Sequence, residues 1–127
     1  MSEPLVHGTD FVVVPTKDFE GAVAFYEGIL GLETLRYEQP IGGEFETGNL
    51  TLQVIEMEKI GREVQPSPNP IALHVDDVHA ARERLQAQGV EFEGEILDSG
   101  VCYQAFFRDP DGNMLALHHR YAPRRRS

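Results

Sequence analysis

The 127-residue sequence contains one cysteine and no tryptophan. A single cysteine forms no internal disulfide and cannot supply a four-cysteine zinc cage. No apolar run reaches the 18 or more residues that a membrane-spanning helix needs. The N-terminus also lacks the basic and apolar stretches of a secretory signal. These absences predict a cytoplasmic protein without membrane contact.

Basic residues are also scarce, with 11 Lys and Arg against 21 Asp and Glu and a formal net charge of −10. Nucleic-acid binding needs clustered cations, so we expect no nucleic-acid partner. The charge is compatible with a cationic or neutral small molecule. Arg124, Arg125 and Arg126 make residues 121–127 a basic tail. Such a tail is either a solvated terminus or a contact for an acidic partner or RNA.

The first half of the chain has a recognisable order of elements. Apolar β-branched residues predict a strand at 11–14, and helical spacing follows from Asp18, a candidate N-cap, to Gly31, a candidate stop. We expect further strands at 32–37, 44–47 and 50–56, with Gly42-Gly43 as a turn.

The second half repeats this order. After a proline-rich linker at 64–70, the pattern predicts a strand, a helix capped by Asp77 and stopped by Gly89, and three more strands. The last two strands, 101–107 and 114–118, are joined by the turn sequence DPDGN at 109–113. Both halves therefore predict β-α-β-β-β, and a repeat of this length determines the fold prediction.

Three segments resemble the vicinal oxygen chelate superfamily, which includes glyoxalases, extradiol dioxygenases and bleomycin-resistance proteins. They are DFVVVPTKDFEGAVAFYEGILGLE at 10–33, IALHVDDVHAARERLQAQGVEF at 71–92 and FFRDPDGNMLALH at 106–118. The resemblance implies one α+β domain over 1–127. It implies two paired βαβββ modules, 8–58 and 69–120, whose mixed sheets form a cup-shaped, partly open barrel. It also implies a homodimer, because such modules commonly pair across subunits.

The resemblance implies four positions at which enzymes of the superfamily hold a divalent metal. Here they are Phe11, Gln53, Pro70 and Ala116. Three of these residues have no donor atom in the side chain, and an amide oxygen alone is a weak ligand. We therefore expect no metal cofactor.

Histidines elsewhere could form a displaced site. Strand alternation places His74 and His118 on the face that points into the cup, whereas His119 points away from it. Each can be an acid-base or ligand-contacting imidazole, a residue hydrogen-bonded at the rim, or part of a shifted two-histidine metal site. Cys102 is either a nucleophile or, more simply, a small pocket or core thiol.

The same alternation predicts the residues that line the cup. The expected cavity is mostly apolar with a few polar groups, as in small-molecule sites. Its candidate ligand-binding residues are Phe11, Val13, Gln53, Ile55, His74, Gln104, Phe106, Met114, Ala116 and His118, with Ala72 beside them. No catalytic residue is identified, and the DPDGN turn is expected to be architectural.

Two functions remain open. One is a metal-free protein of the bleomycin-resistance type that binds a small molecule. The other is a lyase, isomerase or dioxygenase of the same superfamily that uses a shifted metal site, or His74 and His118 directly. The volume of the pocket depends on loops at 37–47 and 93–100. The sequence therefore does not identify the ligand.

Overall fold

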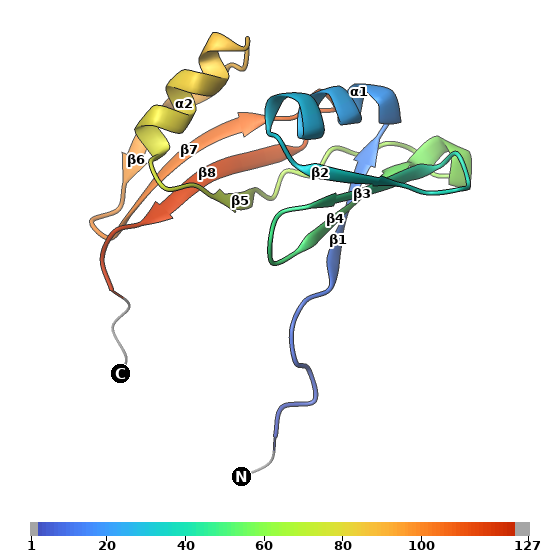
Figure 1. Cartoon of the computed structure of the whole chain (residues 1–127), viewed down its shortest axis with the longest axis horizontal. Coiled ribbons are helices and arrows are strands. Elements are labelled where there is room, and N and C mark those ends of the chain that lie inside the picture. Colours follow the sequence, from blue (N-terminus) through green and yellow to red (C-terminus); the bar gives the residue numbers. More distant parts are fainter. Residues whose placement is uncertain (1–2, 124–127) are drawn as a thin grey trace.

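A computed structural model describes residues 3–123 of the chain. The order of elements in each half is β-α-β-β-β (Figure 1). The basic tail predicted at the C-terminus lies largely outside the described residues, because Arg124–Arg126 are not among them. The elements are β1 (Phe11–Thr16), α1 (Phe19–Val23), the π-helix η1 (Ala24–Ile29), β2 (Glu33–Arg36), β3 (Gly42–Glu46), β4 (Thr51–Glu56), the 3-10 helix η2 (Met57–Ile60), β5 (Ile71–His74), α2 (Val78–Ala87), β6 (Phe92–Asp98), β7 (Cys102–Arg108) and β8 (Met114–Arg120).

The two halves form sheets of identical topology. Sheet one has the strand order β1-β4-β3-β2, and sheet two has the order β5-β8-β7-β6. In each, the first and last strands of the module pair in parallel and the other pairs are antiparallel. This arrangement confirms the predicted α+β class and its two βαβββ modules.

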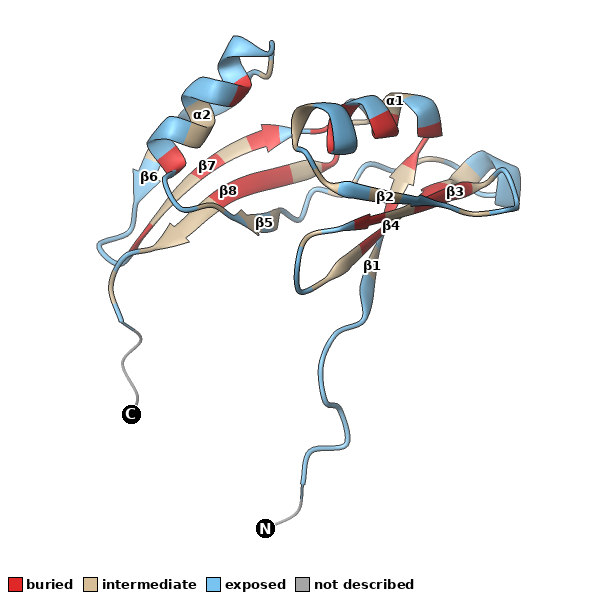
Figure 2. Ribbon diagram, viewed as in Figure 1, coloured by how far each residue is buried: buried red, intermediate tan, exposed pale blue. Residues whose placement is uncertain are grey.

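Strand alternation separates a helix-covered face from an open face in each sheet. Val14, Leu52 and Val54 are buried under α1 and η1, and Leu115 and Leu117 are buried in the second module (Figure 2). The alternate residue Val13 is 45% exposed. These residues follow the predicted assignment of faces, since apolar side chains on the covered face are removed from water, whereas Ala116, predicted on the open face, is 1% exposed.

The two helices begin differently. Asp77 caps α2 as predicted, with its carboxylate accepting a hydrogen bond of 3.1 Å from the Ala80 amide. Asp18 precedes α1, but its side chain makes no capping bond. The Phe19 amide instead donates to Oε1 of Glu56 at 2.9 Å. Asp18 occupies the predicted N-cap position of α1, but the first free donor is satisfied by a carboxylate from β4 and not by the Asp18 side chain.

Gly42 and Gly43 are not a turn but the first two residues of β3. A Cβ on Gly42 would lie 2.0 Å from the Val54 carbonyl oxygen, and one on Gly43 would lie 2.4 Å from that of Leu35. Both positions need glycine because neighbouring backbone approaches closely, which is a long-range reason for glycine in a strand. The chain reverses earlier, where the Ile41 amide donates to the Gln39 carbonyl.

The segment expected to be a loop at 93–100 is mostly strand. It belongs to β6, which pairs with β7 and has an irregularity between Glu93 and Leu97. Gly94, with φ of 73°, lies in this irregular stretch. Glycine within a strand pattern commonly marks such a bulge, so the polar, glycine-containing sequence concealed a paired strand.

The DPDGN turn ties the two modules together. Tyr26 of η1 donates a buried hydrogen bond of 2.6 Å to Asp109. The Asn113 amide group donates to the Pro15 carbonyl at 2.9 Å, and Asp111 accepts from the Lys17 amide at 2.8 Å. Phe25 and Phe107 also pack with ring centroids 6.3 Å apart. The architectural role predicted for this turn is confirmed and extends to the junction between modules.

Candidate functional site

The open face of sheet one combines apolar and polar side chains in register. Val13 pairs with Gln53, Gln53 pairs with Glu44, and Glu44 pairs with Leu35 across four strands. Alternation then places Phe11 and Ile55 on the same face as Val13 and Gln53. Phe11 is 49% exposed, so this face presents apolar surface to whatever lies above it.

An open cavity of about 460 Å³ lies over this face. Three of the predicted binding residues, Val13, Gln53 and Ile55, line it. An adjoining cavity of about 530 Å³, here named the outer cavity, shares Val13 with the cavity of about 460 Å³, here named the inner cavity. Both sizes fall in the range of small-molecule sites, which are typically mostly apolar with a few polar groups.

The segment after β4 supplies the other wall. η2 is followed by Gly61 with φ of 78°, a left-handed conformation that glycine adopts without strain. The Arg62 amide then donates to the Met57 carbonyl at 3.0 Å, which returns the chain toward the sheet. Met57 and Arg62 consequently line both cavities. Sequence reasoning missed them, since residues 57–63 carry no periodic pattern.

Glu44 is a further polar residue of this face that sequence reasoning missed. Its carboxylate accepts a hydrogen bond from the Tyr37 hydroxyl. Burial, followed by this bond to a carboxylate, raises the pKa of Tyr37 to about 12. Glu44 belongs to the strand predicted at 44–47, but only the register of β3 with β4 places it beside Gln53.

The remaining predicted residues are distributed differently. In sheet two, Gln104 pairs with His118 and Phe106 with Ala116, so the structure brings these four residues into two adjacent rows. Met114 is the first residue of β8, the strand that contains Ala116 and His118. Neither these five residues nor Phe11 line the cavities described here. Ala116 is buried at 1% exposure.

His74 lies at the junction of the modules. It lines a cavity of about 270 Å³ whose other walls include Leu30, Leu32 and Leu73. Its backbone is in register with His118, while its ring centroid lies 5.7 Å from that of His119. Nδ1 of His119 lies 3.1 Å from the Val75 carbonyl oxygen. One chain therefore does not gather His74 and Gln53 around a single cavity.

The four positions implied for a metal do not fit a divalent ion. Phe11, Pro70 and Ala116 provide no donor, and Gln53 provides one amide oxygen. Across residues 3–123, no three His, Cys, Asp or Glu side chains come together in a group that could hold a metal. No reaction step through a metal is therefore derived for this chain.

The single cysteine is buried in sheet two. The Cys102 sulfur lies 3.1 Å from the Ser99 hydroxyl oxygen and 3.9 Å from Nε2 of Gln104. These neutral partners neither remove a proton from a thiol nor stabilise a thiolate as a cation does. The environment favours the interpretation of Cys102 as a small packed thiol.

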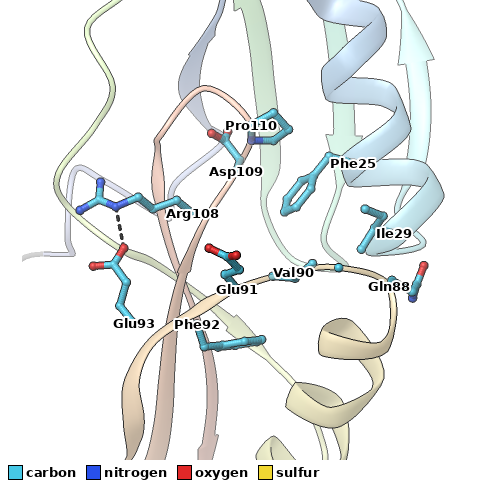
Figure 3. A pocket seen from close by; sticks show the side chains of 11 residues that line it. Phe25, Ile29, Gln88, Val90, Glu91, Phe92, Glu93, Arg108, Asp109 and Pro110 are labelled. Carbon is cyan, nitrogen blue, oxygen red and sulfur yellow. Dashed lines mark hydrogen bonds and ion pairs between the residues drawn. The ribbon is translucent and has the colours of Figure 1, made fainter.

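A separate cavity of about 430 Å³ lies between η1 and the start of β6, with Phe25, Ile29 and Phe92 in its walls (Figure 3). Arg108 at its edge forms an ion pair of 2.6 Å with Glu93 and also donates to the Gly112 carbonyl at 2.9 Å. No predicted binding residue lines this cavity.

No helix within residues 3–123 is long and apolar enough to cross a membrane.

Comparison with known proteins agrees with this architecture. Residues 8–117 match the model of the glyoxalase/bleomycin resistance protein/dioxygenase superfamily, and the chain belongs to that family. A lactoylglutathione lyase of Neisseria meningitidis serogroup A is 30% identical over 75% of this chain and 78% of its own. TnmS3, an antibiotic-binding protein from Streptomyces sp. CB03234, is 25% identical, with a TM-score of 0.75 over 93% of this chain and 99% of its own.

Proposed function

We propose that the protein binds a small molecule without a metal, at the cavity on the open face of sheet one. The observation that carries this proposal is the convergence of Val13, Gln53 and Ile55 on one cavity of about 460 Å³. The apolar walls would hold the body of a ligand, and the Gln53 amide can both donate and accept hydrogen bonds. The similarity to an antibiotic-binding protein supports this class of function.

We also propose that a homodimer completes the cup. The side chains of Phe11, Val13 and Leu35 leave apolar surface exposed on sheet one, and such a patch is typical of an interface. The edge strands of the sheet also present unpaired backbone groups that a partner can cover. The second module of the partner would then bring its Gln104, Phe106, Met114, His118 and His74 toward the ligand. Light scattering is expected to give about twice the 14.2 kDa of one chain, and a monomer at high concentration would contradict the dimer.

The experiment that tests the metal-free site is elemental analysis of protein purified without chelator. Because three implied ligand positions lack donors, we expect less than about 0.2 equivalents of Zn, Ni, Mn or Fe per chain. A ligand-induced rise in melting temperature should persist after treatment with EDTA. One tightly held metal per chain would overturn the metal-free site.

The alternative function is enzymatic. Curated relatives named lactoylglutathione lyase, at 27% and 30% identity, favour it. In that case the chain acts as a lyase, isomerase or dioxygenase through a shifted metal site or through His74 and His118. The alternative would be supported if the wild type holds one metal ion per chain and the His74→Ala and His118→Ala variants each hold none. These residues are proposed as its ligands or acid-base groups.

A further inference from the structure

We propose that Arg62 makes the open face of sheet one select small molecules that join an apolar body to a carboxylate. This inference rests on the proposed binding function and specifies its ligand class. It differs from what the net charge of −10 suggests, since an acidic protein would be expected to favour cations.

The first observation is the position of Arg62. It lines both adjoining cavities, and the hydrogen bond from its amide to the Met57 carbonyl fixes its backbone above Val13 and Ile55. Gly61 provides the left-handed turn that brings it there. The guanidinium is thus attached to a defined wall of the site.

The second observation is that Arg62 is unpaired within the described chain. No carboxylate of residues 3–123 lies within 4.0 Å of it, and its side chain makes no hydrogen bond there. Two carboxylates near the face have other partners. Glu56 pairs with Lys59 at 2.7 Å, and Glu44 accepts from Tyr37.

The third observation is the chemistry of the surrounding walls. Ile41, Ile55, Met57 and Ile60 give the inner cavity an apolar lining, with Gln53 as its neutral polar group. Glu63 lines only the outer cavity. A planar guanidinium binds a carboxylate through two parallel hydrogen bonds, so an anion reaching the inner cavity meets a matched donor.

Long-range repulsion does not cancel this contact. At physiological ionic strength, charges separated by more than about 8 Å are largely screened, whereas a direct contact with Arg62 is not. The direct contact with Arg62 therefore decides the preference for a carboxylate over a cation once the ligand has entered the cavity.

The test uses three probes of similar shape: 2-naphthoate, neutral 2-naphthamide and cationic 2-naphthylmethylamine. Each is titrated into the full-length protein, its dissociation constant is measured by calorimetry, and its site is mapped by backbone amide shifts. We expect 2-naphthoate to bind about two- to fivefold more tightly than 2-naphthamide, because an exposed ion pair contributes up to about 1 kcal/mol. Both should shift the amides of Val13, Gln53 and Met57.

Substitutions isolate the guanidinium. Arg62→Gln should weaken the binding of naphthoate more than that of naphthamide and so remove the difference between them. Arg62→Lys should retain part of it. Arg84→Gln, which removes the same charge from α2, is the matched control and should leave the difference intact.

The outcomes separate the two proposals. Equal affinities for naphthoate and naphthamide at this face, or tighter binding of the amine, would overturn the selectivity and leave the binding site standing. Failure of all three probes to shift the amides of this face would overturn the site together with the selectivity.

Discussion

The two modules share one topology but differ on their open faces. The first module is followed by η2 and Gly61, which build a wall over β1 and β4. The second module ends in β8, and no comparable segment of the described chain folds back over it. The cavity proposed to bind the ligand therefore arises from the connection after the first repeat, while the repeat itself provides the sheet. A repeated fold can thus carry a site in one copy that the other copy lacks.

Beneath the open faces the modules are alike, and their cores should contribute equally to the free energy of unfolding. Phe45 and Phe107 are both fully buried. We expect Phe45→Ala and Phe107→Ala each to lower the free energy of unfolding by about 3–5 kcal/mol. Because Phe25 packs against Phe107 across the junction, urea denaturation should show a single transition in each variant. Two separate transitions would show that the modules unfold independently.

The junction can be weakened without opening a cavity by Tyr26→Phe. The change removes a buried hydrogen bond to Asp109 and should cost about 1–3 kcal/mol. Burial, followed by the negative charge of Asp109, raises the pKa of Tyr26. A raised pKa contributes stability that is fully present below the unfolded-state pKa of about 10 and is lost as pH rises above it.

The stability difference between the wild type and Tyr26→Phe should consequently shrink above about pH 10 in denaturation experiments. A difference that stays constant from pH 8 to 11 would contradict a buried, neutral tyrosine at the junction. Phe45→Ala, which removes no titratable group, is a control for general effects of high pH.

The dimeric cup predicts that the second module also contributes to binding. Phe106 does not line the cavity of its own chain, yet Phe106→Ala should weaken binding of 2-naphthoate by roughly 1–3 kcal/mol if the partner's sheet covers the ligand. Val101→Ala, in the turn before β7, is the control and should change little. Unaltered affinity in Phe106→Ala would restrict the site to the first module.

The smallest expected difference concerns the helix starts. Asp77→Ala removes a capping hydrogen bond and should cost about 1 kcal/mol. Asp18→Ala, at the equivalent position, should cost close to nothing, since its carboxylate does not cap α1. Thermal denaturation of the two variants measures this contrast, and equal losses would show that the two starts are equivalent after all.

Local patterns were sufficient to predict the repeat, the buried apolar residues of β1 and β8, and the DPDGN turn. Each depends on alternation, helical spacing or turn chemistry that neighbouring residues define. The glycine pair at 42–43 was misread because close approach by Val54 and Leu35 depends on contacts distant in sequence.

The candidate site was only partly predictable for the same reason. Val13, Gln53 and Ile55 followed from alternation, whereas Arg62 depends on a left-handed glycine and a short 3-10 turn. How the two sheets meet is a tertiary property. Strand parity places His74 and Gln53 on open faces, but it does not determine whether those faces share one cavity.

The central claim is that the open face of the first module binds a small molecule without a metal. Titration of EDTA-treated, isotopically labelled protein with 2-naphthoate, followed by backbone amide shifts, tests it most directly. Saturable shifts are expected at Val13, Gln53, Met57 and Arg62. Shifts confined to other surfaces, or binding that appears only after a divalent metal is added back, would contradict it.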